Sequence, residues 1–236
     1  EYRPLMSRDY PTPELLTDLY ELNMLHAYWA HGMTGTAVFD LYVRALPDQR
    51  NYLVAAGLEQ ALDYLETLSF SPASLQTLAD LPAPGDFPPD FLDSLANFRF
   101  TGHVDAVAEG TPVFAGEPIL RVEAPLPEAQ FVETYLLNQI HLQTTLASKA
   151  ARVVDAADGR SVVDFGARRA HGIDAANKAA RAGYLAGFTG TSNVLASHRY
   201  RIPPAGTMAH SYIQAIGDEL TAFRSFAATS PDTVLL

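Results

Sequence analysis

Hydrophobic and polar positions change their period several times along the chain, and each change predicts an element. Between Pro13 and His31, leucines recur every three or four positions, which is typical of an amphipathic helix. Thr36–Arg44 alternates apolar and polar side chains and predicts a strand. Tyr52–Leu68 returns to helical spacing. The chain therefore begins as a mixture of helix and strand.

Proline and glycine divide the middle of the chain into shorter elements. Ser71-Pro72 predicts a short helix with proline in its first turn, and the four prolines of Pro82–Pro89 predict a loop. Arg99–Val122 is β-like, with turns expected at Glu109-Gly110 and Ala115-Gly116. This middle part is therefore expected to add antiparallel strands to the helices that precede it.

A long helix follows a boundary marked by Pro125 and Pro127. The helical pattern runs from about residue 128 to about residue 156. We place the domain division near its start, which gives residues 1–128 and residues 129–236 as two domains. Both helices and strands are expected in the first of these domains.

Three short β-favouring runs in the second domain end in glycine and polar residues, and a helix-like segment follows each run. These runs are Val162–Val163, Gly183–Phe188 and Ile202–Thr207, and a fourth run, Thr233–Leu236, ends the sequence. Ser192 or Asn193 is suited to cap the helix after the second run. Strand–helix alternation is typical of a parallel sheet with crossover helices, so the predicted fold class is α/β.

Side chains suited to binding or catalysis lie where these strands are expected to end. They are Asp164, Phe165, Arg168, Arg169, Thr191, Ser192, Asn193, Thr207, His210 and Ser211. The carboxyl ends of parallel strands form the usual site of chemistry in such sheets. Guanidinium groups bind carboxylates and phosphates through a planar fork, and an aromatic ring stacks on another flat ring. The strand ends therefore suit a flat anionic ring together with a phosphate.

Five motifs resemble those of nicotinate phosphoribosyltransferases, in the same order and at similar spacing. Three are DFGARRAHG, GFTGTSNVLA and GTMAHS at the strand ends, and two precede them, TDLYELNM at Thr17–Met24 and ETYLLNQIHLQTTLASKAAR at Glu133–Arg152. The resemblance covers nearly the whole chain. It implies that residues 1–128 are an N-terminal α+β domain. Residues 129–236 would be the first part of an irregular, TIM-like α/β barrel of the type II phosphoribosyltransferases.

The resemblance implies an ATP-coupled transferase of NAD biosynthesis. Such an enzyme joins nicotinate to phosphoribosyl diphosphate and releases nicotinate mononucleotide and diphosphate. The histidine that matches His210 is phosphorylated by ATP in this family, so phosphohistidine is expected at His210. Mg²⁺ is expected to neutralise the diphosphate. A cytoplasmic homodimer with a shared active site is also implied.

The resemblance assigns roles to aromatic and basic side chains. Phe165 would stack on the pyridine ring, although a core position suits it as well. Arg168, with Arg169 as second choice, would hold the nicotinate carboxylate or a phosphate. Tyr20 would reach nicotinate across a dimer, whereas periodicity alone makes it a core or interface residue.

Polar side chains complete the expected site. Thr207 would contact nicotinate through its backbone or hydroxyl group. Thr191 and Ser192 would offer amides and hydroxyls to a phosphate, and Gly190 beside them is equally a turn residue. His171 is a minor candidate. We expect no metal ligands in this chain, because the family's diphosphate and metal sites lie in a part that this sequence does not contain.

Composition excludes several other classes of function. The net charge is −11, from 27 acidic and 16 basic residues, and no basic stripe suggests a nucleic-acid partner. Cysteine is absent, so disulfides and thiol chemistry are excluded. Neither a signal peptide nor a long apolar span is visible, which favours a cytoplasmic protein that does not enter a membrane. The DFG triplet lacks the glycine-rich loop and HRD stretch of a protein kinase.

Two alternatives remain open. Nicotinamide phosphoribosyltransferase has a similar fold, but amide-specific relatives are expected to place an acid where Ser192 stands. The second alternative is a non-catalytic fragment that retains half of a site, since the family's chain is much longer. A partial barrel has unpaired sheet edges, so the isolated chain is expected to be inactive unless a second chain completes it.

Overall fold

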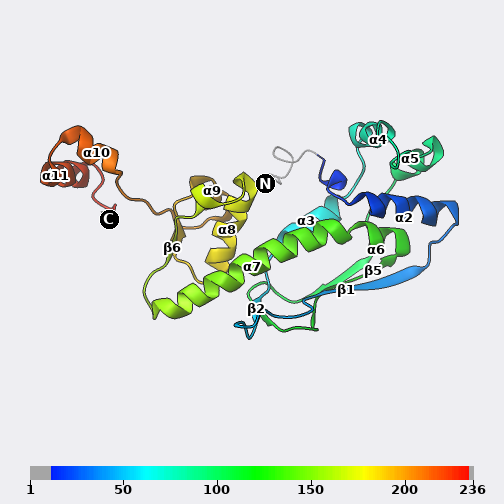
Figure 1. Ribbon diagram of the computed structural model, residues 1–236, viewed down its shortest axis with the longest axis horizontal. Helices are drawn as coiled ribbons and strands as arrows, with labels where there is room; N and C mark the ends of the chain where they lie inside the picture. The colour runs from blue at the N-terminus through cyan, green and yellow to red at the C-terminus, as the bar shows by residue number, and fades with distance from the viewer. Residues whose placement is uncertain (1–11, 234–236) are drawn as a thin grey trace. The chain divides into compact units, whose positions relative to one another are not determined.

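The computed structural model describes residues 12–233, which divide into two compact units between Thr145 and Leu146 (Figure 1). The long helix α7 (Glu133–Ala157) contains the point of division. The domain division predicted near residue 128 stays a prediction. The fourth β-favouring run falls largely on residues 234–236, outside the described residues.

The first unit combines two small antiparallel sheets with helices. Its helices are η1 (Pro13–Leu15), α2 (Leu19–Ala30), α3 (Leu58–Thr67), α4 (Pro72–Ala79), α5 (Pro89–Leu95) and α6 (Leu126–Phe131). Its strands are β1 (Thr36–Tyr42), β2 (Leu53–Val54), β3 (His103–Ala106), β4 (Pro112–Val113) and β5 (Pro118–Pro125). The predicted α+β composition agrees with this arrangement.

The main sheet has the strand order β1-β5-β3, with both pairs antiparallel, and β2 and β4 form the second sheet. Thr36 lies opposite Pro125, and the register continues to Asp40 opposite Arg121. The Arg121 guanidinium forms two bonds across this pair, from Nε to Oδ1 of Asp40 at 2.7 Å and from Nη2 to Oδ2 at 3.0 Å. The register is thus fixed by side chains as well as by backbone pairing.

Aromatic side chains fill the core of the first unit. Phe131 is fully buried, and its ring lies 5.3 Å from the rings of Phe70 and Phe98. Tyr64 stacks on Tyr135 with ring centroids 3.7 Å apart. Leu120 and Val122 of β5 belong to the same buried cluster. Since burial of apolar surface is the dominant favourable contribution to folding, this cluster holds the helices on the sheet.

Two predicted helices of the first unit are interrupted. The helix predicted over 13–31 consists of η1 and α2, because Asp18 is extended before α2 and its carboxylate accepts a bond from Thr134 Oγ1 at 2.9 Å. The prediction over 52–68 is wrong in its first part, where Leu53 pairs with Val113 before α3 begins. Gly57 permits this change because its φ is +103°, and a Cβ there would lie 2.6 Å from the carbonyl oxygen of Gln139.

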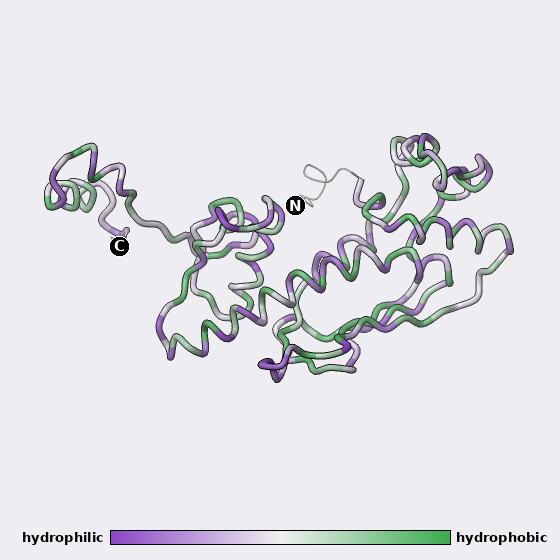
Figure 2. The backbone as a smooth tube through the Cα atoms, in the orientation of Figure 1, coloured by the Kyte–Doolittle hydropathy of each residue, from purple (hydrophilic) through white to green (hydrophobic). Residues whose placement is uncertain are grey.

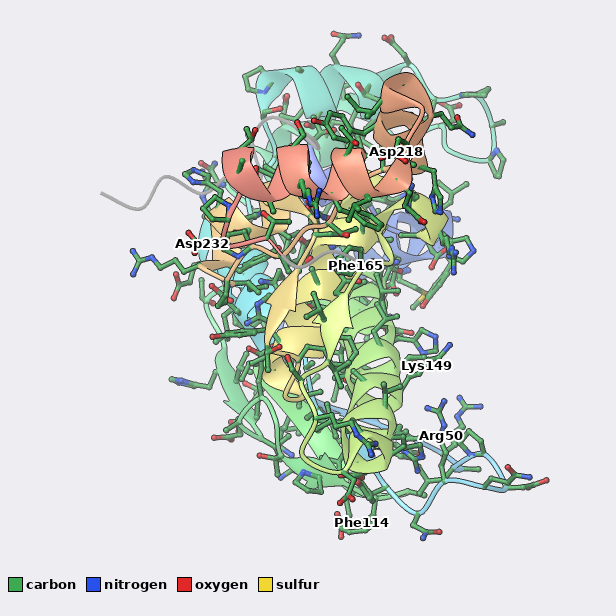
Figure 3. The ribbon with its side chains drawn as sticks, turned by 90° about the vertical axis from the view of Figure 1, so that its left-hand side faces the viewer. Arg50, Phe114, Lys149, Phe165, Asp218 and Asp232 are labelled. Carbon is green, nitrogen blue, oxygen red and sulfur yellow. The ribbon has the colours of Figure 1, made fainter. Side chains whose placement is uncertain are left out.

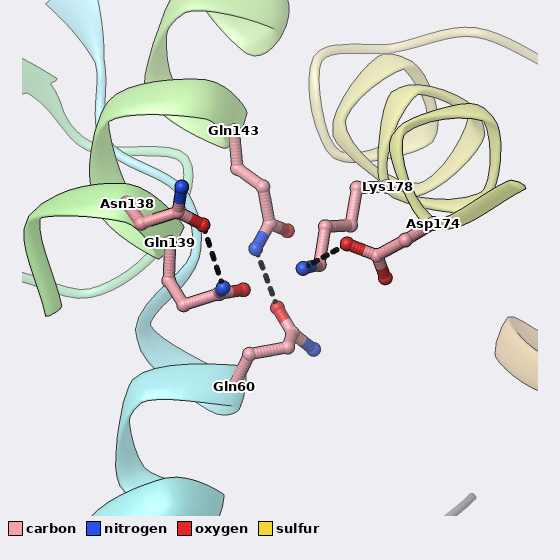
Figure 4. A network of polar contacts seen from close by, with 6 residues as sticks. All are labelled: Gln60, Asn138, Gln139, Gln143, Asp174 and Lys178. Atoms are coloured by element: carbon pink, nitrogen blue, oxygen red, sulfur yellow. Dashed lines mark hydrogen bonds and ion pairs between the residues drawn. The ribbon is translucent and has the colours of Figure 1, made fainter. Parts of the chain in front are cut away.

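Hydrophilic and hydrophobic residues alternate along helix α7 (Figure 2). Its polar residues Gln143 and Thr144 are buried. Thr144 Oγ1 accepts a bond from the amide of Ala56 and donates to its carbonyl oxygen, each at 3.1 Å. Gln143 Nε2 donates to Gln60 Oε1 at 2.8 Å (Figure 4). These bonds compensate for the burial of polar groups and fix α7 against the start of α3.

The second unit contains short parallel strands joined by helices. Its elements are β6 (Val163–Asp164), η2 (Ala167–Arg169), α8 (Ile173–Leu185), β7 (Gly190–Thr191), α9 (Val194–Tyr200), α10 (His210–Ile216) and α11 (Glu219–Thr229). The strand predicted at Gly183–Phe188 is placed too early, since α8 extends to Leu185. Its alanine-rich sequence favours helix over strand. The parallel alternation itself is as predicted.

Helices α10 and α11 pack against each other (Figure 1). The Tyr212 and Phe226 rings meet edge to face at 5.8 Å, and Tyr212 Oη lies 2.9 Å from Ser225 Oγ. Among residues 12–233, no helix is both long and apolar enough to cross a membrane.

Candidate functional site

Three parallel segments bring the predicted strand ends together. Val163 pairs with Gly190 and Asp164 with Thr191. Thr191 in turn forms a parallel bridge with Pro204, with its amide donating to Pro203 at 3.0 Å. Strand–helix alternation in the sequence predicts this parallel arrangement.

Gly190 allows the segment around Pro203 to approach β7 closely. A Cβ at this position would lie 2.8 Å from the carbonyl oxygen of Pro203. The requirement for glycine is therefore packing of backbone on backbone, which is the turn-like, structural interpretation of this residue.

The loop after β6 presents the aromatic and basic candidates. Asp164 Oδ1 accepts a bond from the amide of Gly166 at 2.8 Å, which turns the chain into η2. Phe165 is 39% exposed at the end of the paired strands (Figure 3). Arg168 and Arg169 are exposed, and neither guanidinium has a hydrogen bond or ion pair within the described part of the chain. An accessible ring thus lies in the same short loop as two available cations.

Thr191 connects the loop after β6 with the loop after β7. Its buried hydroxyl donates to Asp164 Oδ2 at 2.7 Å and accepts a bond from the amide of Asn193 at 3.0 Å. The Thr191 and Ser192 amides donate to Pro203 and Asp164 carbonyl oxygens, at 3.0 and 2.8 Å. The Ser192 hydroxyl, in contrast, has no hydrogen bond among residues 12–233, and the phosphate contacts of Thr191 and Ser192 stay predictions.

Asn193 ends the loop and begins α9. Its Oδ1 accepts a bond from the amide of Ala196 at 3.1 Å, so Asn193 is the N-cap, one of the two residues that the sequence suggests for this role. Its Nδ2 donates to Oδ1 of the buried Asn177 on α8 at 3.0 Å. Both asparagines line a cavity of about 330 Å³ between the start of α8 and the start of α9.

The third strand end carries Thr207 and His210. Both residues are exposed, and His210 is the first residue of α10. Within residues 12–233, no hydrogen bond or ring contact joins His210 to Phe165 or to the two arginines. Its participation in a common site therefore stays a prediction, as does that of His171, which is exposed before α8.

Tyr20 belongs to the first unit, whereas the other candidates belong to the second. Its ring is 47% exposed, and partial burial together with the neighbouring Glu21 and Glu133 carboxylates raises the pKa of its hydroxyl. Glu21 is fully buried, which raises the pKa of its carboxyl group. Gln130 Nε2 donates to both carboxylates, at 2.8 Å to Glu21 and at 3.1 Å to Glu133. Tyr20 thus stays a neutral phenol beside an acidic pair.

Sequence reasoning missed the roles of Asp164 and Asn177 in this site. The motifs place Asp164 among the strand-end residues without a function, and Asn177 lies inside a helix with no motif to distinguish it. The signal available in the sequence is that Asn177 is a polar residue with low helix propensity between the alanines of a predicted helix.

The described residues offer no cluster of three or more histidine, cysteine, aspartate or glutamate side chains suited to a metal ion. The accessible guanidinium groups are suited instead to anions such as carboxylate or phosphate.

Two family models match the chain. Residues 15–141 match the model described as the nicotinate phosphoribosyltransferase (NAPRTase) N-terminal domain. Residues 160–235 match the model described as the nicotinate phosphoribosyltransferase (NAPRTase) family. Together these matches include both units.

Curated relatives carry the same name. The chain is 56% identical over 222 residues to nicotinate phosphoribosyltransferase pncB2 of Mycobacterium tuberculosis, and this match covers 94% of the chain and 47% of the relative. It is 46% identical over 223 residues to nicotinate phosphoribosyltransferase of Bacillus subtilis, covering 94% of the chain and 45% of the relative. The chain therefore spans about half the length of the curated relatives it matches.

Solved structures confirm the predicted fold class. Human nicotinic acid phosphoribosyltransferase matches with a TM-score of 0.76 and 36% identity, covering 85% of the chain and 40% of that structure. A nicotinate-nucleotide pyrophosphorylase from Pyrococcus furiosus matches with a TM-score of 0.75 and 23% identity, covering 95% of the chain and 50% of that structure. The α/β fold, with an N-terminal α+β region before the start of a type II phosphoribosyltransferase barrel, is shared with these proteins.

Proposed function

Because the chain belongs to the nicotinate phosphoribosyltransferase family, we propose that a protein containing it joins nicotinate to phosphoribosyl diphosphate in NAD salvage. The products are nicotinate mononucleotide and diphosphate. The observation that carries this proposal is the loop after β6, where the accessible Phe165 ring and two guanidinium groups without internal partners among the described residues lie within five positions of one another in the sequence. A flat ring bearing a carboxylate matches that combination.

The loop acts chiefly by positioning. Phe165 stacks on the pyridine ring, and Arg168 or Arg169 holds the carboxylate or a phosphate through its planar fork. The ring nitrogen attacks the anomeric carbon, the bond from that carbon to diphosphate breaks, and the transition state has oxocarbenium character. Orienting the two substrates and stabilising the departing charge supply most of the rate enhancement.

ATP coupling is assigned to His210. A neutral imidazole nitrogen attacks the γ-phosphate of ATP, ADP leaves, and later hydrolysis of the phosphohistidine resets the site. The exposure of His210 at the start of α10 supports access to ATP. The phosphoryl group adds negative charge and acceptor oxygens that arginine side chains bind well.

Magnesium and dimer formation belong to the same proposal. Mg²⁺ reaches the site with the diphosphate group of the substrate, and we assign it no ligand among the described residues. A second copy of the protein completes the site with Tyr20. The partial exposure of this ring on α2 supports that role.

The test uses a complete protein containing this chain, incubated with nicotinate, phosphoribosyl diphosphate, Mg²⁺ and labelled ATP. Nicotinate mononucleotide should form faster with ATP than without it, and the protein should take up acid-labile, base-stable phosphate. His210→Ala should take up no phosphate and lose ATP stimulation. His103→Ala, which alters another exposed histidine on β3, should behave as the unmodified protein.

Other outcomes distinguish the alternatives. Preference for nicotinamide over nicotinate would assign the amide-specific activity instead. Absence of turnover with both bases would reject a transferase role, and ATP-stimulated synthesis by His210→Ala would return this residue to a structural or substrate-contacting role. The isolated 236-residue chain is expected to bind anions weakly without turnover.

A further inference from the structure

The carboxylate of Asp164 bonds to both loops that follow the paired strands. One oxygen accepts the Gly166 amide of its own loop at 2.8 Å, and the other accepts the Thr191 hydroxyl of the neighbouring loop at 2.7 Å. Both bonds end on the same carboxyl group, so one side chain joins the two loops. The side chain is half-buried, so water competes only partly for its oxygens.

The bonds continue beyond Thr191 to the helix that follows. The Thr191 hydroxyl accepts the Asn193 amide, and the Asn193 side chain caps α9 and donates to Asn177. A displacement at Asp164 therefore reaches the start of α9 through consecutive hydrogen bonds, and Ser192 lies in the backbone between the two bonded residues Thr191 and Asn193. Neither Asp164 nor Asn177 contacts a substrate in the proposed reaction.

We propose that Asp164 is a positioning residue, whose carboxylate sets the loop of Phe165 and Arg168 in register with the loop of Ser192. This inference rests on the proposed function for its catalytic consequence and on the hydrogen bonds for its structural one. Asp164 aligns the ring-binding loop with the hydroxyl-bearing loop before the substrates arrive.

The opposite end of the same two strands provides a matched control. Ser161 Oγ lies 2.5 Å from Thr189 Oγ1, and Thr189 Oγ1 also bonds to the Val162 carbonyl oxygen at 3.1 Å. This link joins the same strands at the end away from the candidate site. If hydrogen bonds between the strands served stability alone, disrupting either end would have similar consequences.

Kinetics of a complete protein containing this chain provide the first test. Asp164→Ala should raise the KM for nicotinate at least tenfold, with a smaller change in kcat, whereas Thr189→Val should leave both constants within about twofold of the unmodified protein. Thr191→Val should resemble Asp164→Ala, and Thr191→Ser, which keeps the hydroxyl, should recover most of the loss. Equal effects of Asp164→Ala and Thr189→Val would overturn the inference.

A double variant separates positioning from direct contact by Thr191. If the two side chains act through their mutual bond, Asp164→Ala combined with Thr191→Val should cost little more than either change alone. If the fold-change in KM of the double variant were the product of the two single fold-changes, Thr191 would act independently of Asp164. That result would contradict the proposed connection. Absence of nicotinate turnover in the unmodified protein would reject the proposed function and would leave the second measurement below to decide this inference.

Hydrogen exchange decides the structural part without substrate. The amide of Asn193 bonds to Thr191 and lies one side chain away from Asp164. In Asp164→Ala its exchange should be at least tenfold faster than in the unmodified protein, and in Thr189→Val it should be unchanged. Unchanged exchange at Asn193 in a folded Asp164→Ala protein would overturn the inference. If that variant fails to fold, Asp164→Asn, which keeps the size of the side chain but replaces one acceptor oxygen by an NH2 group, is measured in its place, with the same supporting and contradicting results at Asn193.

Discussion

The two units of this chain differ in the interactions that stabilise each of them internally. The first unit buries a continuous aromatic and aliphatic cluster that includes Phe91 and Phe131. In the second unit the buried cluster formed by Ala180, Ala196 and Ile202, with Tyr200 packed against it, is much smaller. The first unit therefore owes its conformation mainly to apolar burial, while hydrogen bonds and helix caps define the strand ends of the second.

Large exposed apolar side chains also show that the second unit depends less on apolar burial. Ile173 is 71% exposed at the start of α8, and Val194 is 78% exposed at the start of α9. Both lie next to the candidate site, where they gain little from folding of this unit. An arrangement that depends on a few polar bonds can be altered at one residue with a small effect on overall stability, which suits a site more than a core.

The largest expected effect comes from removing an aromatic ring in the first core. Phe131→Ala should lower the free energy of unfolding of the first unit by about 3–5 kcal/mol, because it removes a buried ring and leaves a cavity. Urea unfolding followed by the fluorescence of Trp29, the single tryptophan of the chain, measures this value.

The matched control removes an apolar side chain of the second unit. Ile173→Ala should change stability by no more than about 0.5 kcal/mol, since most of the side chain is already in water. Hydrogen exchange in α8 reports this change directly. Comparable losses from the two substitutions would break the contrast between the units.

Helix caps are expected to have smaller and similar effects in both units. Asn193 Oδ1 caps α9, and Ser71 Oγ caps α4 by accepting the Ser74 amide at 3.1 Å. Replacing either residue by alanine should cost roughly 1 kcal/mol of local stability. Hydrogen exchange of the two helices measures both. If only Ser71→Ala had an effect, polar bonds would not be what stabilises the second unit.

The smallest expected effect is a change in how the stability of the first unit depends on pH. Burial raises the folded-state pKa of the Glu21 carboxyl, so the folded protein holds this proton more tightly than the unfolded chain. Its contribution is most favourable below the unfolded pKa of about 4.3 and is lost as pH rises through the higher folded value. Glu21→Gln should therefore gain stability relative to the unmodified protein as the pH rises from about 4 to about 8 in thermal unfolding. A constant difference across that range would contradict a proton held by Glu21.

Sequence periodicity is most successful where one local signal determines the structure. The helix start at Ser71-Pro72 and the turns at Glu109-Gly110 and Ala115-Gly116 are present as predicted. Proline geometry and glycine freedom act within a few residues, so no distant partner is needed to recognise them.

Long-range contacts explain what periodicity missed. Leu53 and Val54 have the spacing of a helix, yet they pair with a strand that lies almost sixty residues further along the chain. The first turn of α3 is likewise capped by Glu109, whose Oε1 accepts the Leu58 amide at 3.1 Å. Neither partner is adjacent in the sequence, and tertiary pairing prevails over local propensity.

The location of the candidate site is more predictable than its connections. Strand–helix alternation in the sequence is enough to place Phe165, Arg168 and Ser192 at neighbouring strand ends. The hydrogen bonds of Asp164 and Thr191 depend on which oxygen atom faces which donor. Residue types alone do not specify this. Roles of the individual binding residues therefore stay predictions that the kinetic variants address.

The pairing of Thr36 with Pro125 also has a consequence for synthesis of the protein. Strand β1 leaves the ribosome about 90 residues before the strand that completes its sheet, which at roughly 5–20 residues per second corresponds to about 4–18 s. During that interval its backbone donors and acceptors are unpaired, and Val38 and Phe39 are accessible to other nascent chains. An unpaired apolar strand is a template for aggregation. Chaperone binding to nascent chains should therefore be strongest before residue 125 emerges.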